Sequence, residues 1–250
     1  VATIEDNVVT IVGAGSSTIT ANQASTTNFL SGSTIVLLTV NRIPTILTSF
    51  SLPEKTFGDA SFSLVAPTSN REGAFVYTSS DPTVATIDGD IVTIVGGGSA
   101  TITAVQPSTS SYRSGTISAL LQVNKVKTVL PDFSVPVKII GEPAFTIDPP
   151  ATNSDGAFTY TSSNPAVATI DGDVVTMVGL GVTTIIARQA GTSNYTSAAI
   201  DTTFQVKRIR TVLSNFVIPA KTIGDTSFTL VPPTTNGVGT FTYTSSNLLV

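Results

Sequence analysis

Residues 84–93 read VATIDGDIVT, and closely similar stretches begin at Val1 and Val167. Each stretch begins 83 residues after the previous one, and Val250 falls in the same register. No insertion or deletion interrupts the three periods. Self-similarity at one fixed period is the signature of a repeat architecture. The chain is therefore predicted to be a tandem array of one module.

The module has the size and composition of a small all-β domain. Hydrophobic residues make up 41% of the chain, and a repeat of 83 residues is long enough to bury a core of its own. Only 11% of the residues are charged, so copies repel one another weakly and lateral self-association is plausible. Interchangeable units suggest a function of length, stiffness and display, because a chemical site would distinguish one copy from the others.

Composition also argues against several classes of partner. The formal net charge of −4 opposes nucleic-acid binding, which needs Lys and Arg gathered on one face. Cysteine is absent, so neither a disulfide framework nor a thiolate metal site is available. No apolar run approaches the length of a membrane span, and any signal peptide or anchor is expected outside this segment.

Within one repeat, the local patterns predict strands and turns. The stretch ATITA at 100–104 alternates polar and apolar residues, and β-branched and aromatic residues fill 75–79 and 91–95. A tight hairpin is expected at Asp88-Gly89, because Gly tolerates positive φ. The same hairpin is expected at Asp171-Gly172 and, less ideally, at Asp6-Asn7. Seven short strands in each repeat predict a β-sandwich. In the copy 43–125 they are expected over 45–52, 60–66, 74–79, 84–88, 91–95, 99–106 and 115–124.

Residues 77–104, YTSSDPTVATIDGDIVTIVGGGSATITA, resemble the hallmark of the bacterial Ig-like domains, group 2, of invasin- and intimin-type surface proteins. The motif recurs at 160–187 and, split between the two ends of the chain, at 243–250 and 1–21. The resemblance implies extracellular β-sandwich modules, as in the stalks of adhesins, in surface-layer and carbohydrate-acting proteins, and in phage or viral structural proteins.

One aromatic position departs from the pattern of this family. The family often has Trp before the Thr-Ser-Ser element, where this chain has Tyr77, Tyr160 and Tyr243. Tyrosine keeps a large apolar ring and adds a polar tip, so these residues are expected to anchor the core of each sandwich.

A glycine motif near the start of the chain is similar to a dinucleotide-binding turn. Residues 10–15 read TIVGAG, but a dinucleotide site needs a following helix whose N-terminus receives the pyrophosphate. The residues that follow predict a strand, and the glycine pair recurs at Gly96/Gly98 and Gly179/Gly181. A hairpin is the favoured interpretation, because glycine supplies the positive φ that its corner needs, and no cofactor is predicted.

Acidic residues recur in two turns that could be read as cation sites. One set is Asp88/Asp90 and Asp171/Asp173, with Glu5, Asp6 and Asn7 in the first copy, and the other is Asp59, Glu142 and Asp225, each after a Gly. Calcium needs six or more oxygen ligands, which these turns do not supply. Turn chemistry is the favoured interpretation for both sets, and no metal ligand is predicted.

Chemistry between side chains is also disfavoured. An intramolecular Lys–Asn crosslink is conceivable because Lys55, Lys138 and Lys221 recur together with Asn70, Asn153 and Asn236. Each Asn stands in a polar loop, which favours solvated Lys and loop Asn. Histidine and cysteine are absent, which excludes Ser/His and Cys/His nucleophile systems, and the acidic residues are scattered in turns. No catalytic residue is predicted, and the segment is expected not to be an enzyme.

Recurrent aromatics have mainly structural interpretations. The Phe residues of two series, Phe50/Phe133/Phe216 and Phe62/Phe145/Phe228, are expected in the cores. The loop aromatics Phe29, Tyr112 and Tyr195 are expected to cap the ends of the sandwiches, with sugar stacking as the alternative. The sequon Asn194-Tyr195-Thr196 occurs in one copy only and is interpreted as incidental.

The predicted organisation is a tandem array of all-β, Ig-like sandwiches arranged end to end as a rod. Two complete domains are expected at 43–125 and 126–208, between the C-terminal part of a domain at 1–42 and the N-terminal part of another at 209–250. The joint at 117–130 contains no Gly, which argues against a flexible linker. The two partial domains are expected to be completed by continuation of the chain, which is the simpler explanation, or by neighbouring chains.

The leading hypothesis for function is a structural spacer or stalk in an extracellular surface protein or adhesin. The partners are then neighbouring repeats, with lateral self-association as a further option. A fibre or decoration protein on the surface of a virus or phage particle is a close alternative. A carbohydrate-binding or accessory module of a secreted enzyme is an alternative of a different class, with surface carbohydrate as the partner.

Overall fold

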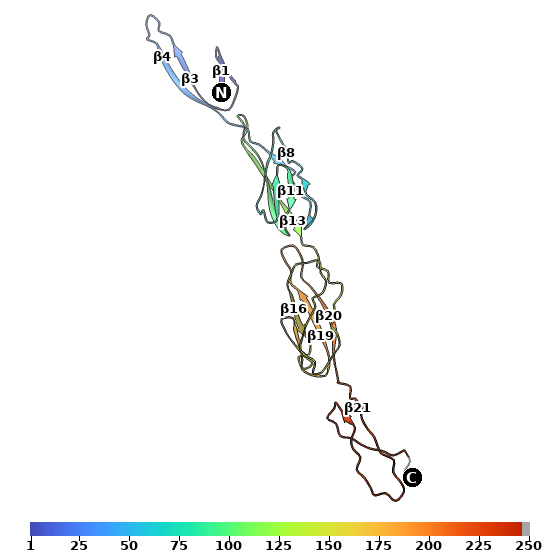
Figure 1. The fold of residues 1–250 in the computed structure, drawn as a ribbon. Coiled ribbons are helices and arrows are strands. Elements are labelled where there is room, and N and C mark those ends of the chain that lie inside the picture. The colour runs from blue at the N-terminus through green and yellow to red at the C-terminus, as the bar shows by residue number, and fades with distance from the viewer. Residues whose placement is uncertain (247–250) are drawn as a thin grey trace. The chain divides into compact units, whose positions relative to one another are not determined.

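The computed structural model describes residues 1–246, and Figure 1 shows that their regular structure consists of strands. The chain divides into two compact units. Unit 1 comprises Val1–Val129, Thr152–Gly156 and Ala190–Ala198, and unit 2 comprises Leu130–Ala151, Ala157–Gln189 and Ala199–Val250. In the part that the structure describes, no helix is long and apolar enough to cross a membrane. The end of the predicted partial domain, 247–250, lies outside the described residues, and with it the register position Val250.

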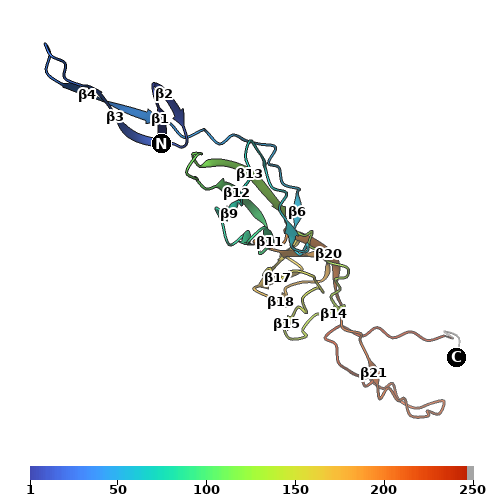
Figure 2. The same ribbon diagram turned by 90° about the horizontal axis from the view of Figure 1, so that it is seen from above.

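The first complete repeat, 43–125, lies in unit 1 and forms three small sheets. Its strands are β5 (Leu47–Thr48), β6 (Lys55–Thr56), β7 (Phe62–Ser63), β8 (Thr68–Ser69), β9 (Val76–Ser79), β10 (Ala85–Asp88), β11 (Ile91–Ile94), β12 (Gly98–Gln106) and β13 (Gly115–Asn124). The larger sheet has the order β6-β13-β12-β9, the second has β10-β11-β7, and β5 pairs with β8. Figure 2 shows β9, β12 and β13 side by side with β6 at the edge.

The second complete repeat has the same two main sheets, within unit 2 except for the first residue of its last strand. Its strands are β14 (Lys138–Ile139), β15 (Phe145–Thr146), β16 (Phe158–Ser162), β17 (Ala168–Asp171), β18 (Val174–Met177), β19 (Gly181–Gln189) and β20 (Ala198–Lys207). They are ordered β14-β20-β19-β16 and β15-β18-β17. This all-β, Ig-like sandwich architecture is the fold class predicted from the sequence.

The flanking segments form two-stranded pairs without the remaining strands of a sandwich. Residues 1–42 contain β1 (Ala2–Glu5), β2 (Val8–Ile11), β3 (Gly15–Gln23) and β4 (Gly32–Val40). These pair as β1-β2 and β3-β4, and residues 209–246 contain only the pair of β21 (Leu213–Ser214) and β22 (Thr234–Thr235).

Each complete repeat has one core that follows the two-residue period of its strands. Along β12, Ala100, Ile102 and Ala104 are buried at alternate positions, and Leu121 and Val123 face them from β13. The second repeat buries Ile185, Phe204 and Val206 in the same register. Each large side chain removed from water in this way stabilises its repeat by about 1.5–3 kcal/mol.

Strands from the two ends of a repeat lie next to each other. Strand β6 pairs in parallel with β13, with Lys55 opposite Val123 and Thr56 opposite Asn124. The N–H of Phe57 continues this ladder by donating to the carbonyl of Asn124 at 2.9 Å. The second repeat forms the same parallel pair between β14 and β20.

The predicted strands differ most from the structure near the start of the repeat. The predicted strands 115–124 and 99–106 correspond to β13 and β12, whereas 45–52 and 60–66 shrink to β5 and β7. Pro44, Pro53 and Pro67 flank these segments, and proline cannot donate to a ladder. The two-residue strands β6 and β8 are additions to the predicted set.

The predicted tight hairpins are confirmed. Asp88 is opposite Ile91, so Gly89 and Asp90 form a two-residue loop, and Gly89 has φ of 59°. Gly172 occupies the same position in the second repeat with φ of 61°. In the first copy Asp6 adopts φ of 56°, which Asp tolerates better than most residues other than Gly.

Candidate functional site

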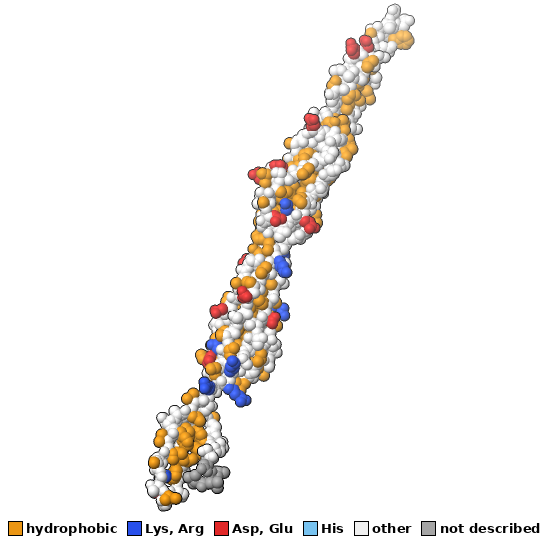
Figure 3. Space-filling view, turned by 90° about the vertical axis from the view of Figure 1, so that its right-hand side faces the viewer, with side chains coloured by type: hydrophobic (Ala, Val, Ile, Leu, Met, Phe, Trp, Pro, Cys, Tyr) orange, Lys and Arg blue, Asp and Glu red, His pale blue; other side chains and the backbone are white. Residues whose placement is uncertain are grey.

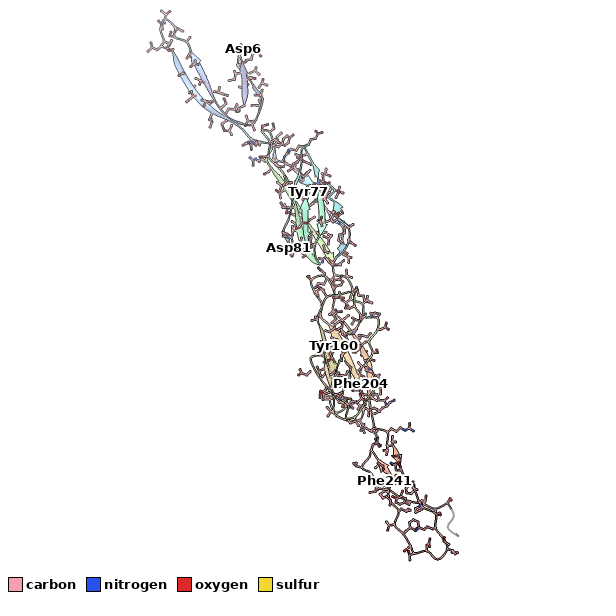
Figure 4. All side chains as sticks on the ribbon, in the orientation of Figure 1. Asp6, Tyr77, Asp81, Tyr160, Phe204 and Phe241 are labelled. Carbon is pink, nitrogen blue, oxygen red and sulfur yellow. The ribbon has the colours of Figure 1, made fainter. Side chains whose placement is uncertain are left out.

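A group of three stacked aromatic rings recurs in each copy. Tyr77 on β9 lies between Phe50 and Phe75, with ring centroids 6.2 and 6.0 Å away. Tyr160 and Tyr243 lie between equivalent Phe pairs, with three of these four contacts stacked and the Phe133–Tyr160 contact tilted. Tyr77 and Tyr160, labelled in Figure 4, pack against the cores of the complete repeats, as predicted. Both remain partly exposed, so these rings line the surface as well as the interior.

The second repeat has an open groove beside its tyrosine. The groove has a volume of about 620 Å³. It is lined by Ile147, Pro149, Phe158, Thr159, Tyr160, Gly172 and Asp173. Two aromatic rings and one carboxylate thus border the same hollow, an arrangement that could stack against an apolar face and accept hydrogen bonds from hydroxyl groups.

The phenol groups of these tyrosines stay protonated at neutral pH. Burial raises the pKa of Tyr160, and the negative charge of Asp173 raises this pKa further. The pKa of Tyr77 is raised in the same way by burial and then by Asp90. Each hydroxyl can therefore donate a hydrogen bond, and neither is prepared to act as a nucleophile or base.

The recurrent asparagines fix the start of each repeat. The N–H of Ile46 donates to Asn70 Oδ1 at 3.0 Å, and Asn70 Nδ2 donates to the carbonyl of Pro44 at 3.1 Å. We call this pair of bonds the Asn clamp. It recurs with Asn153 on Val129 and Lys127, and with Asn236 on Val212 and Arg210. In each case the Asn side chain accepts a bond from one backbone N–H and donates a bond to a backbone carbonyl two residues earlier. It thus holds the segment that leads into the repeat as a neighbouring strand would.

The recurrent Asn side chains form the Asn clamp and not the Lys–Asn crosslink considered from the sequence. The Nζ of Lys55 lies 4.6 Å from the ring centroid of Phe62, whereas the amide of Asn70 bonds to Ile46 and Pro44. Lys138 lies over Phe145 and forms an ion pair with Glu142, with Nζ 3.4 Å from Oε2. The interpretation of these Asn residues as ordinary loop residues missed the clamp, although their exact 83-residue recurrence was visible in the sequence.

The second acidic set forms turns. The N–H of Thr56 donates to Asp59 Oδ2 at 2.9 Å, and Asp225 accepts from Thr222 in the same way. Gly58, Gly141 and Gly224 supply positive φ beside them. Among residues 1–246, no group of three or more acidic, His or Cys side chains could hold a metal ion. The absence of metal ligands in the chain stays a prediction.

One exposed acidic residue organises the loop before β10. The hydroxyl of Thr83 donates to Asp81 Oδ1 at 2.6 Å, and the backbone N–H of Thr83 donates to the same oxygen at 2.9 Å. These bonds, the hydroxyl first, lower the pKa of Asp81. Asp81, labelled in Figure 4, therefore acts as an Asx turn.

The loop aromatics behave differently from copy to copy. Arg71 lies over the ring of Tyr112, 5.5 Å from its centroid, and Tyr195 makes an edge contact with Phe57 inside unit 1. Tyr112 and Tyr195 therefore pack against neighbouring side chains, as expected of residues that cap a sandwich. Phe29, in contrast, is 76% exposed.

The single sequon has a structural role inside unit 1. Asn194 Oδ1 accepts a hydrogen bond from the N–H of Gly97 at 3.1 Å, and Thr196 Oγ1 accepts one from the N–H of Thr128 at 3.1 Å. A Cβ on Gly97 would lie 2.6 Å from the carbonyl oxygen of Ser193, so this approach requires glycine. The sequence alone gave no signal for this contact.

The glycine motif at 10–15 leads into strand β3 and not into a helix. The predicted hairpin is wrong, because β2 pairs with β1 whereas β3 pairs with β4. The glycines instead turn the chain from one sheet into the next, and Gly15, with φ of 138°, starts β3. The predicted absence of catalytic and cofactor-binding residues is not tested by this geometry and stays a prediction.

Comparison with known proteins places part of the chain in a family. Residues 62–117 match the bacterial Ig-like domain family (group 2). No curated protein matches the chain.

Solved structures of other proteins are similar in part. A structure of Drosophila N-cadherin EC1-4 has 12% identity and a TM-score of 0.28, and the match covers 77% of this chain and 58% of that one. Human protocadherin-24 EC1-2 has 14% identity and a TM-score of 0.28, over 66% of this chain and 99% of that one. A SusE-like surface-located polysaccharide-binding protein of Bacteroides thetaiotaomicron has 13% identity and a TM-score of 0.25, and the match covers 78% of this chain and 39% of that one.

The family match covers the strands from β7 to the start of β13, which include the hairpin and most of the core of the first complete repeat. The resemblance drawn from the sequence is thus confirmed for this stretch, because residues 62–117 match the bacterial Ig-like domains of group 2.

Proposed function

We propose that the chain is a non-catalytic structural spacer of an extracellular surface protein or adhesin. The observation that carries this proposal is the repetition of the same contacts in every copy. The Asn clamp and the aromatic group recur at the same positions of the three successive copies in residues 43–246. A selected chemical site would have diverged in one copy, whereas a spacer needs each unit to do the same thing.

The entry into each repeat supports a stiff spacer. The Asn clamp orders the segment that leads into the repeat, and residues 117–130 at the predicted joint contain no Gly. Charged side chains are sparse over the surface in Figure 3, so charge repulsion plays a minor part in any extension.

Small-angle scattering on the full chain, with and without a chelator, tests the spacer. We expect an extended particle whose dimensions do not change on chelation, because the acidic turns are closed by their own hydrogen bonds. A compact particle would contradict the spacer, and a particle that becomes flexible only after chelation would show that a cation stiffens the chain.

Carbohydrate binding is a second candidate, favoured by the groove in the second repeat. Phe158 and Tyr160 offer aromatic surface there, and Asp173 offers a hydrogen-bond acceptor. Titration calorimetry with a panel of polysaccharides tests it, with Tyr160→Phe keeping the ring and Asp173→Asn removing the charge. Binding that Asp173→Asn abolishes would support this candidate. If no polysaccharide binds, the spacer is the only function that remains.

Localisation at a cell surface is part of the proposal. Antibody labelling of intact source cells is expected to detect the chain. Its recovery with purified particles would instead support the alternative, a fibre or decoration protein of a virus or phage.

A further inference from the structure

The third Asn clamp contains a dipeptide that the other two clamps lack. Asn236 is followed by Gly237, whereas the clamp Asn is followed by Arg71 in the first complete repeat and by Ser154 in the second. No other Asn of the sequence precedes a Gly. The clamp Asn is exposed in both complete repeats as well as at 236, so its exposure is a property of the module.

An Asn side chain can react with the backbone that follows it. The nitrogen of the next residue attacks Cγ, a bond forms between these two atoms, and the bond from Cγ to Nδ2 breaks. The departing amide group takes the proton of the backbone N–H and leaves as ammonia. Water then opens the cyclic imide at either carbonyl, which gives aspartate or isoaspartate. Glycine has no Cβ to hinder the attack, so Gly237 makes Asn236 the most reactive clamp Asn.

The fold does not need glycine at position 237. A Cβ built there would lie 3.4 Å from Thr211 Cγ2 and 3.5 Å from Thr235 Oγ1, which are ordinary van der Waals distances. The φ of Gly237 is outside the left-handed region, and both complete repeats carry a side chain at this position. The glycine therefore changes the reactivity of Asn236 and is not a requirement of the turn.

Three hydrogen bonds hold the two reacting groups of this dipeptide. Asn236 Oδ1 accepts from the N–H of Val212 at 2.8 Å, and Asn236 Nδ2 donates to the carbonyl of Arg210 at 3.1 Å. The N–H of Gly237 donates to Thr235 Oγ1 at 2.9 Å. The side-chain amide has to leave the first two bonds before it turns toward the Gly237 nitrogen, and that nitrogen has to leave the third.

The bond to the backbone nitrogen also belongs to the module. The N–H of Arg71 donates to Ser69 Oγ at 3.2 Å, and the N–H of Ser154 donates to Thr152 Oγ1 at 3.1 Å. All three copies thus hold the clamp Asn and the nitrogen after it in the same way. Only the third copy combines this arrangement with a glycine.

We propose that Asn236 is a site of spontaneous deamidation and that the Asn clamp controls its rate. The aspartate product keeps an acceptor for Val212 but has no donor for the carbonyl of Arg210. The isoaspartate product lengthens the main chain directly after β22, which pairs with β21 (Figure 1). Both products weaken the clamp, so the third copy loses its entry contact with age while the complete repeats keep theirs. The proposal goes beyond the spacer function and does not rest on it.

Incubation of the full chain at mildly alkaline pH, followed by peptide mapping with mass spectrometry, tests the site. We expect conversion at Asn236 and retention of the amide at Asn70 and Asn153, which are controls within the same molecule because they form the same clamp. Equal conversion at the three positions would overturn the proposal. So would an Asn236 that keeps its amide in the unfolded chain.

Gly237→Ser is the matched variant, because the second repeat has serine at this position. The added Cβ should suppress conversion of Asn236 in the native chain and in denaturant. Hydrogen exchange at residues 210–213 should stay unchanged, because the clamp bonds do not involve the side chain of residue 237. Conversion as fast as in the parent chain would contradict the role of Gly237.

The control by the clamp is tested by the rate in denaturant and by Thr235→Val. Hydrogen bonds of about 1 kcal/mol each keep the open form scarce, so denaturant should speed conversion of Asn236 by about tenfold or more. Thr235→Val removes the acceptor of the Gly237 N–H and should speed conversion about fivefold in the native chain, with no change in denaturant.

Two results would contradict this control. One is an equal rate of conversion in the native and the unfolded chain, and the other is a native rate that Thr235→Val leaves unchanged. Neither result bears on the spacer, which is judged by the dimensions of the particle and not by the chemistry of Asn236.

Discussion

The complete repeats and the flanking segments have nearly the same sequence at equivalent positions but different burial. Ile102 and Ile185 are fully buried, whereas Ile19, at the same position of residues 1–42, is only partly buried. The hairpin of β3 and β4 forms with the register of β12 and β13 in both contexts. Local pairing therefore needs only the two strands, whereas core burial needs the other half of the repeat.

Substitution of the equivalent isoleucines should give the largest contrast. Ile102→Ala is expected to lower the free energy of unfolding of its repeat by about 2–5 kcal/mol, through lost burial and a cavity. Ile19→Ala should cost about 1 kcal/mol or less in dilute solution, because part of the side chain is already in water. Hydrogen exchange resolved by peptide measures both effects locally.

The same two substitutions can also contradict the difference in burial between the two regions. If Ile19→Ala costs as much as Ile102→Ala in dilute solution, residues 1–42 must already bury this position. Ile185→Ala serves as the control, since it should match Ile102→Ala in the second repeat.

The Asn clamp should give an intermediate effect that does not depend on a complete core. Asn70→Ala removes two hydrogen bonds at an exposed position and should cost about 1 kcal/mol. Asn70→Asp keeps the acceptor for Ile46 and loses the donor to Pro44, so its cost should be smaller. Denaturant unfolding followed by segment-resolved exchange measures these values.

The clamp also shows whether residues 209–246 and the complete repeats share an interaction that does not need a core. Asn236 makes the same two bonds within residues 209–246, so Asn236→Ala should loosen its segment about as much as Asn70→Ala does. An effect confined to the complete repeats would show that the clamp depends on the core.

The smallest effect concerns alkaline pH. Burial raises the pKa of Tyr77 and Tyr160 above the unfolded value of about 10. Their contribution to stability is thus fully present below pH 10 and is lost as the pH rises through the folded pKa. Denaturant midpoints at neutral and strongly alkaline pH should differ less in Tyr160→Phe than in the parent chain. An unchanged pH dependence would show that other groups control alkaline unfolding.

Much of the fold was predictable because it depends on local and periodic signals. The 83-residue period, the hairpins at Gly89 and Gly172 and the long strands of each repeat follow from spacing, φ preference and alternation. The domain boundaries and the rod-like arrangement stay predictions.

The candidate site was less predictable because it depends on contacts distant in sequence. Asn70 and Asn153 clamp segments 24–26 residues away, and loop composition does not reveal such a partner. The groove at Tyr160 needs a tyrosine that is only partly covered, whereas apolar character alone predicted a core anchor.

The parallel pair of β6 and β13 determines how a repeat would respond to mechanical tension. Lys55 and Thr56 lie near the start of the repeat, and Val123 and Asn124 lie at its end. A pull on the two ends draws these strands past each other, so the load is shared by all bonds of the ladder and by the adjacent Phe57–Asn124 bond. Hydrogen bonds that carry the load at the same time must break at the same time. The barrier to forced unfolding is then higher than when the hydrogen bonds open one by one. Resistance to force is then governed by the rate of unfolding at this short ladder and not by the overall stability of the repeat.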